Sequence, residues 1–186
     1  MGKIFYISDL HWGHANCIRF DNRPYNSVEE MDKALIDNWN SVVTDEDTIY
    51  VVGDMFWCKG DEAIKILEQL KGKKRLIKGN HDRIHDSKFK KHFEKITEYD
   101  EIEDNGRKVV LCHYPIPCFK NHFYGWYHLY GHVHTSFEWN MMKSIRREMK
   151  ELYDKPCKMY NCGAMVDYMN FTPRTLDEIL EANGDK

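Results

Sequence analysis

The sequence lacks the features that would place the protein in a membrane or outside the cell. None of its apolar runs approaches the roughly 18 residues that a membrane-spanning helix needs. The first residues, MGKIFYISDLH, lack the basic segment and the apolar segment that are typical of a secretion signal. We therefore expect a cytoplasmic protein with no membrane partner.

Charge of one sign and paired cysteines are also scarce. Charged residues make up 31% of the chain, yet they nearly cancel to a net charge of −3, so any anion binding has to be local. The six cysteines form no C-x-x-C pair, which argues against a zinc knuckle and favours reduced, mostly buried thiols. With no repeat and no low-complexity linker, residues 1–186 are expected to form one domain.

Apolar runs rich in β-formers alternate with amphipathic segments in the first half of the chain. Strands are predicted within residues 3–9, 48–54, 74–80 and 108–113. A capping box of Ser27 and Glu30 opens one helix, and a second helix is predicted from Asp61 up to Gly72. This alternation implies parallel strands, and in such sheets the functional groups collect at the carboxyl ends of the strands.

The pattern changes in the second half. The stretch EDNG at 103–106 has the Asn-Gly chemistry of a hairpin turn. Two further strands, within 126–134 and 158–165, flank a basic and Met-rich helical stretch from Glu138 to about Leu152, and a short helix closes the chain. The sequence therefore predicts a mixed α/β fold with a second, partly antiparallel sheet.

Residue types that bind metals or move protons stand at the ends of the predicted strands, in DLH, GD, GNHD, CH and GHVH. Seven of them are candidate metal ligands: Asp9, His11, Asp54, Asn80, His113, His132 and His134. Their mixed oxygen and nitrogen donors suit Mn, Fe or Zn better than Ca or Mg. A single histidine such as His113 is more often structural, so it is the ordered set that carries the interpretation. Seven ligands suggest two ions that share a carboxylate, most naturally Asp54, which is the arrangement used in phosphoester cleavage.

The order D-x-H, G-D, G-N-H-[DE], H, G-H-x-H resembles the signature of the calcineurin-like metallophosphoesterases. The resemblance extends from Asp9 to His134 with no block missing. The flanking stretches FYISDLHWGH, LCHYP and NCGAMVDYMNFTPRTLDEI resemble the small single-domain bacterial and phage-type members. The resemblance implies a two-layer mixed β-sandwich flanked by helices, with a binuclear metal site at its rim.

The resemblance also implies roles for the motif residues. One metal would be held by Asp9, His11 and His134, and the other by Asn80, His113 and His132, with Asp54 between them. Mn²⁺ is favoured, with Fe, Zn or Ni as alternatives, and the nucleophile would be a metal-activated water or hydroxide. His81 would stabilise the phosphoryl oxygen or protonate the leaving group, Asp82 would fix the orientation of His81, and Gly79 would let the chain turn sharply.

Candidate substrate contacts lie next to the motifs. The residues that could reach a phosphate are His14, Arg19, Arg23, Arg83 and Tyr114. An ion-paired or solvated role is preferred for Arg19 and Arg23, and a structural role competes evenly for His14.

A helical insertion at about 138–155 departs from the compact family pattern. It carries one basic face, formed by Lys143, Arg146, Arg147 and Lys150, for which a solvated surface paired with Glu148 and Glu151 is the preferred interpretation. The predicted function is metal-dependent hydrolysis of phosphomonoesters or phosphodiesters. The alternatives are a nuclease or nucleotide hydrolase that uses the basic helix, and a scaffold that has lost the chemistry, against which the complete ligand set argues. The expected partner is a phosphoester, with nucleotides and nucleic acids among the alternatives.

Overall fold

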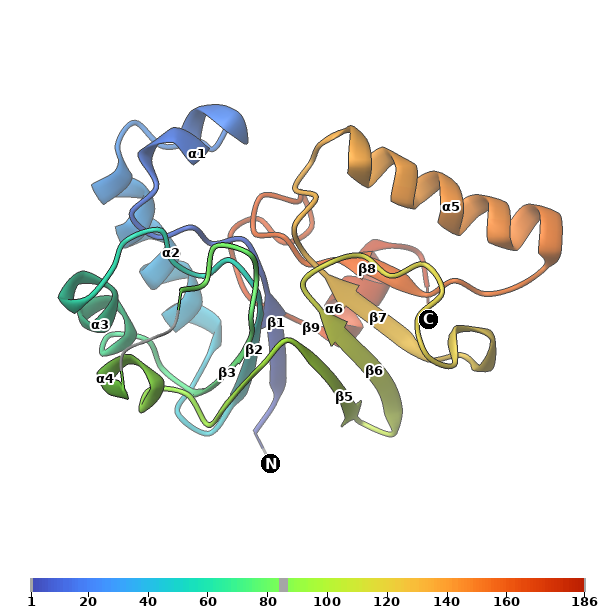
Figure 1. Cartoon of the computed structure of the whole chain (residues 1–186), viewed down its shortest axis with the longest axis horizontal. Coiled ribbons are helices and arrows are strands. Elements are labelled where there is room, and N and C mark those ends of the chain that lie inside the picture. The colour runs from blue at the N-terminus through green and yellow to red at the C-terminus, as the bar shows by residue number, and fades with distance from the viewer. Residues whose placement is uncertain (1, 84–86, 186) are drawn as a thin grey trace.

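The computed structural model describes residues 2–83 and 87–185, which form two β-sheets with helices on the outside (Figure 1). The first sheet has the strand order β4-β3-β2-β1-β9. Four of its strands are parallel, namely β1 (Ile4–Ile7), β2 (Thr48–Val52), β3 (Lys73–Ile77) and β4 (Lys95–Thr97). The two-residue strand β9 (Arg174–Thr175) pairs antiparallel with β1. The parallel pairing predicted for the first three strands is confirmed.

The second sheet has the strand order β5-β6-β7-β8. Its members are β5 (Tyr99–Asp104), β6 (Arg107–Cys112), β7 (Tyr127–Tyr130) and β8 (Met159–Asn161). Strands β5 and β6 form the predicted hairpin, closed by Asn105 and Gly106 with φ values of 49° and 79°. A tight hairpin turn of type I′ needs such positive values. Strands β6, β7 and β8 are parallel, whereas β5 is antiparallel to β6, so the second sheet is mixed, as the first is through β9. Mixed sheets agree with the predicted fold class.

The helices follow the predicted amphipathic patterns with local differences. The described helices are α1 (Ala15–Phe20), α2 (Val28–Val42), α3 (Asp61–Leu67), α4 (Ser87–Lys90), α5 (Phe137–Tyr153) and α6 (Leu176–Ala182), with a 3-10 turn η1 (His122–Tyr124). The Ser27 hydroxyl accepts the Glu30 N–H at the start of α2, but the Glu30 carboxylate accepts the Asn26 N–H, so the capping box is only half formed. Helix α3 ends at Leu67, well before the predicted Gly72.

The strands alternate their side chains between two apolar clusters. Val109 and Leu111 of β6 point into the main core, which also contains residues of β1, β2, α2, α3 and α6, whereas Val110 points to the opposite face. There it joins a smaller cluster that Trp139, Met142 and Met149 of α5 cover. Helix α5 therefore packs along the outer face of the second sheet (Figure 1). Within the described ranges, no helix is both long and apolar enough to cross a membrane.

Candidate metal centre

The predicted ligands follow the carboxyl ends of β1, β2, β3, β6 and β7, and backbone hydrogen bonds join these ends. The Asp9 N–H donates to the Gly53 carbonyl at 3.0 Å, and the His11 N–H donates to the Asp54 carbonyl at 3.1 Å. Across the second sheet, the Gly131 N–H donates to the His113 carbonyl at 2.9 Å. Residues far apart in the chain thus meet at one edge of the molecule.

The backbone is strained at most of the candidate ligands. Left-handed φ values occur at Asp9 (54°), His11 (54°), Asp54 (51°), His132 (71°) and His134 (45°). For a residue with a Cβ this conformation costs on the order of 1 kcal/mol or more. Strain of this kind persists where the surrounding structure enforces it, and it gathers at functional sites.

The glycines of the GD and GNHD motifs are required by close contacts with the candidate ligands. A Cβ at Gly53 would lie 2.1 Å from Nδ1 of His113, and one at Gly79 would lie 2.2 Å from Oδ1 of Asp54. The φ of Gly79 is not in the left-handed region, so the expected sharp turn does not explain this glycine. The close approach of Asp54 explains it instead.

The first group of side chains consists of Asp9, His11 and His134, which offer ligand atoms within 4.8 Å of one another. Nε2 of His134 lies 3.2 Å from Nε2 of His11 and 3.5 Å from Oδ1 of Asp9. Burial lowers the pKa of His11 to about 4, so its imidazole is neutral at pH 7. Burial also disfavours a charged His134, but its hydrogen bonds to Asp21 and Asp9 outweigh this effect and raise its pKa to about 10.

The second group consists of Asp54, His113 and His132, whose ligand atoms also lie within 4.8 Å of one another. The amide oxygen of Asn80 joins them, 3.1 Å from Nε2 of His113 and 2.9 Å from Nδ1 of His132. Nδ1 of His113 donates to the Val52 carbonyl at 3.0 Å, which leaves Nε2 directed at the group. Burial lowers the pKa of His113, but the hydrogen bond to Asp54 and the nearby Asp9 outweigh it and raise the pKa to about 9.

Both groups fit divalent metal ions. Each combines a carboxylate with two imidazoles, a donor set suited to transition metals. In addition, Nε2 of His11 and Nε2 of His134 lie only 3.2 Å apart in the first group. A metal ion would relieve the repulsion between the carboxylates and satisfy nitrogens that now face one another.

His81 and Asp82 differ in their placement. The His81 backbone N–H donates to Oδ1 of Asp54 at 2.9 Å, and its exposed imidazole packs against the rings of Trp57 and His11. The buried carboxylate of Asp82 instead accepts the backbone N–H groups of Asp54, Met55 and Gly79 at 2.8–3.0 Å. The expectation that Asp82 orients the His81 ring is therefore not met, since Asp82 joins the β2 and β3 loops through their backbones.

Arg23 has the ion-paired role that was preferred for it, and its buried position argues against the alternative of a substrate contact. Its side chain is fully buried, and its guanidinium donates to the Asp9 and Leu10 carbonyls at 2.9 and 2.8 Å. It also pairs at 2.9 Å with Asp21, whose other carboxylate oxygen accepts Nδ1–H of His134 at 2.7 Å. Asp21 belongs to none of the motifs, so the sequence pattern gives no sign of this contact.

The other candidate substrate residues lie on the rim. The ring of His14 stacks on Trp57 with 4.0 Å between centroids, and the ring of Tyr114 lies 4.6 Å from that of His132. Arg83 is exposed beside His81. Arg19 is also exposed, on α1, with its guanidinium 5.2 Å from the ring of Phe20.

The basic face of α5 does not line the metal centre. Lys143, Arg146, Arg147 and Lys150 border a groove of about 500 Å³ together with residues of 156–158 and the C-terminal segment. Arg146 pairs with Asp185 and packs 4.3 Å from the ring of Tyr160. The ion pairs differ in part from the predicted ones, because Arg147 lies 3.9 Å from Glu151 whereas Lys150 pairs with Asp154, and Glu148 pairs with no described residue.

Comparisons with known proteins agree with this geometry. Residues 3–170 match the family model described as the calcineurin-like phosphoesterase superfamily domain. The chain belongs to this superfamily. It is 36% identical over 185 residues to an uncharacterised protein of Methanocaldococcus jannaschii, a match that covers 97% of this chain and 91% of the relative.

The chain is also similar to two further proteins. The gene 66 protein of Mycobacterium phage L5 is 39% identical over 88 residues, which cover 46% of this chain and 42% of the phage protein. A crystal structure of a protein of unknown function from Aquifex aeolicus has a TM-score of 0.65 and 21% identity, with 98% of this chain and all of that chain covered. The similarity to the Aquifex aeolicus structure shows that the two chains share a fold. Phosphoesterases of this superfamily bind divalent metals, in agreement with the two groups of side chains.

Proposed function

We propose that the chain is a hydrolase that cleaves phosphomonoesters or phosphodiesters with two divalent metal ions, Mn²⁺ in the first place. One observation supports this most directly. Two groups of side chains, each with one carboxylate and two imidazoles, meet at the strand ends of a chain that belongs to the phosphoesterase superfamily. The bound ions would supply Lewis acidity and a water that is acidic enough to attack near neutral pH. The cytoplasm remains the expected location on sequence grounds.

The chain's own residues have distinct tasks in this proposal. Asp54 would lie between the two ions, and its position is supported by the His81 N–H that binds Oδ1 and by His113 3.3 Å from Oδ2. The exposed imidazole of His81 would contact the phosphoryl group or the leaving oxygen. His14 follows a strand of the first sheet and Tyr114 follows a strand of the second. The two side chains would border the substrate from two sides.

The test is to strip the protein of metal, add Mn, Fe, Ni, Zn or Mg, and assay p-nitrophenyl phosphate and bis(p-nitrophenyl) phosphate. Asp54→Ala should lose metal and most activity. His81→Ala should keep its metal content and lose roughly 10²- to 10⁴-fold in rate, as for a positioned acid or electrostatic group. Asp37→Ala, at an exposed site on α2, is the matched control. Inactivity of the reconstituted parent on both substrates, or normal turnover by Asp54→Ala, would refute the proposal.

The nuclease alternative keeps the same centre and differs in the substrate surface. It would use the cations of α5, which border a groove away from the candidate ligands. The non-catalytic scaffold is the least supported alternative, because all seven candidate ligands are present at the strand ends.

A further inference from the structure

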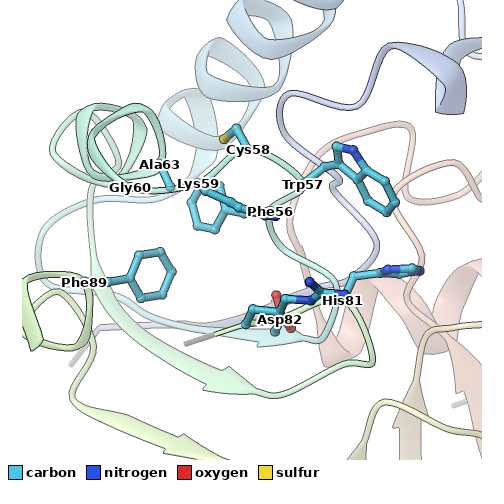
Figure 2. A pocket seen from close by; sticks show the side chains of 10 residues that line it. Phe56, Trp57, Cys58, Lys59, Gly60, Ala63, His81, Asp82 and Phe89 are labelled. Atoms are coloured by element: carbon cyan, nitrogen blue, oxygen red, sulfur yellow. The ribbon is translucent and has the colours of Figure 1, made fainter. Parts of the chain in front are cut away.

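A pocket opens directly beside His81, between the segment after β2 and the segment after β3 (Figure 2). Two adjoining hollows, of about 190 and 80 Å³, share Phe56, Trp57, Lys59, His81 and Arg83 in their lining. Both are smaller than the roughly 300 Å³ at which pockets for whole small molecules begin. The pocket therefore suits one part of a larger substrate whose scissile phosphate lies at the metal centre.

The pocket has an aromatic wall and an apolar floor. Trp57 is 45% exposed, although its ring packs against His14 on one side and lies 5.1 Å from the ring of His81. Figure 2 shows the Trp57 and His81 rings at the same side of the pocket, while Phe56, Ala63 and Phe89 form the opposite side. Such a surface suits a planar ring that stacks or packs edge-on.

The rim of the pocket carries two cations that have no carboxylate partner among the described residues. Lys59 and Arg83 are both exposed, and neither makes an ion pair with another described residue. Elsewhere on the same sheet, Arg75 and Lys78 pair with Glu94 and Glu98. The acidic side chain in the lining, Asp82, is turned inward onto backbone N–H groups. Two like charges on one small pocket would be stabilised by an anion.

These features together select one class of ligand. An aryl group would use Trp57 and leave both cations unpaired, and an inorganic polyphosphate would pair the cations and leave the aromatic wall exposed. A nucleotide uses both surfaces, because it joins a planar base to a phosphate. We propose, resting on the phosphoesterase function above, that this pocket binds a nucleotide unit of a phosphodiester substrate, with the base at Trp57 and a second phosphate between Lys59 and Arg83.

The test compares three diesters under metal-loaded conditions. The first is bis(p-nitrophenyl) phosphate and the second is the dithymidine monophosphate TpT. The third is TpT with one additional phosphate, placed on its 5′ end in one preparation and on its 3′ end in another. For the parent, kcat/KM should be higher when a terminal phosphate is present than for TpT alone. Trp57→Ala should lower kcat/KM for TpT by roughly 5- to 100-fold relative to the parent, the range expected for one stacked base. The aryl diester, whose ring can also pack on Trp57 but which has no second phosphate, should be unaffected by the loss of the two cations. The double variant Lys59→Gln/Arg83→Gln should abolish the advantage of the terminal phosphate.

Matched controls test whether the effects are local. The double variant Lys71→Gln/Lys73→Gln removes the same charge from exposed positions at the amino end of β3, opposite the metal centre. Tyr124→Ala removes an aromatic side chain that is 83% exposed on η1. Both controls should keep the parent's ratio of nucleotide to aryl turnover. No loss on TpT in Trp57→Ala, or an unchanged advantage of the terminal phosphate in Lys59→Gln/Arg83→Gln, would overturn the proposal.

A binding experiment separates this proposal from the catalytic one. Calorimetric titration of metal-free protein with adenosine 3′,5′-bisphosphate should show binding that Trp57→Ala and Lys59→Gln/Arg83→Gln weaken at least tenfold. Binding of this kind without turnover of any phosphomonoester or phosphodiester would refute the phosphoesterase function and retain the pocket. Turnover of the aryl diester with no bisphosphate binding would refute the pocket and retain the function. Tripolyphosphate that binds as tightly as the bisphosphate would show a pocket for phosphate alone and would overturn the assignment to nucleotides.

Discussion

At the scale of single residues, Asp21 holds the ring of His134 in the orientation that a metal ligand needs. Its carboxylate accepts Nδ1–H of His134, which leaves Nε2 directed at Asp9 and His11. Arg23 in turn holds Asp21 through Nε and Nη2, and Nη2 also donates to the carbonyl of Asp9 itself. A carboxylate that accepts the N–H of the second ring nitrogen of a ligating histidine fixes the tautomer of that histidine and raises its basicity.

We predict that Asp21→Asn lowers the affinity of the first metal position by about 10- to 100-fold, the usual cost of losing such a partner. The amide can present its NH₂ group to Nδ1 and favour the wrong tautomer of His134. Metal titration of the purified variant by calorimetry measures the effect, with Asp37→Asn as an exposed carboxylate control. Parent-like affinity in Asp21→Asn would show that His134 is oriented by packing alone.

At the scale of elements, the strand ends were predictable and the loops between them were not. The candidate ligands follow β-rich runs, and parallel pairing brings the carboxyl ends of such runs to one edge, so their proximity could be expected. The directions of Arg23 and Asp82 could not be read in this way. Each depends on the φ and ψ angles of its loop, and both turn inward to satisfy backbone groups.

Element boundaries show the same limit. Residues 95–102, KITEYDEI, form one β-rich run in the sequence, yet the chain changes sheets at Glu98, so Lys95–Thr97 pairs with β3 while Tyr99 begins the hairpin. Helix α1, of six residues, is too short to show a periodic pattern. Periodicity reports which face is buried but not which sheet a strand joins, because that choice depends on contacts between distant segments.

Helix α5 gives a prediction that separates a flank from a nucleic-acid surface. Lys143 packs over Trp139, Arg147 lies 3.9 Å from Glu151, and Lys150 lies 2.9 Å from Asp154. None of these three cations lines the metal centre. Changing the three cations to Gln should leave kcat/KM for both an aryl diester and an oligonucleotide unchanged. Exposed ion pairs contribute only about 0–1 kcal/mol, so folding should persist.

The variant of α5 removes three positive charges and keeps the fourth. Arg146 stays unchanged in this variant, because its contacts with Asp185, Asn183 and Tyr160 hold the C-terminal segment. Assays over a salt series would reveal a polyanion surface. A selective loss on the oligonucleotide with a shallower salt dependence would support the nuclease alternative.

At the scale of the whole molecule, the candidate metal centre joins the two sheets. Asp9, His11, Asp54 and Asn80 follow strands of the first sheet, whereas His113, His132 and His134 follow strands of the second. Each group of three takes ligands from both sides. Metal binding should therefore stabilise the packing of one sheet on the other, since ligand binding to the folded state adds to its stability.

The protonation of the centre makes this stabilisation depend on pH. The pKa values of His113 and His134 are raised to about 9 and 10, chiefly because nearby carboxylates outweigh burial, so both imidazoles hold a proton at pH 7. Their contribution to the stability of the metal-free fold is complete below the ordinary histidine pKa of about 6.5 and is lost as the pH rises through these raised values. A metal ligand must be deprotonated, so binding has to displace both protons.

We predict that metal binding at pH 7 releases roughly two protons per chain and that the affinity rises steeply between pH 6 and 8.5. His11 adds no proton, because burial has already lowered its pKa to about 4. Calorimetry in buffers of different ionisation enthalpy counts the released protons. His113→Asn should release about one proton fewer, whereas His122→Asn, on η1 and outside both ligand groups, should match the parent. A release near zero in the parent would mean that the carboxylates do not hold these imidazoles in the charged form, and the rise in affinity with pH should then be absent as well.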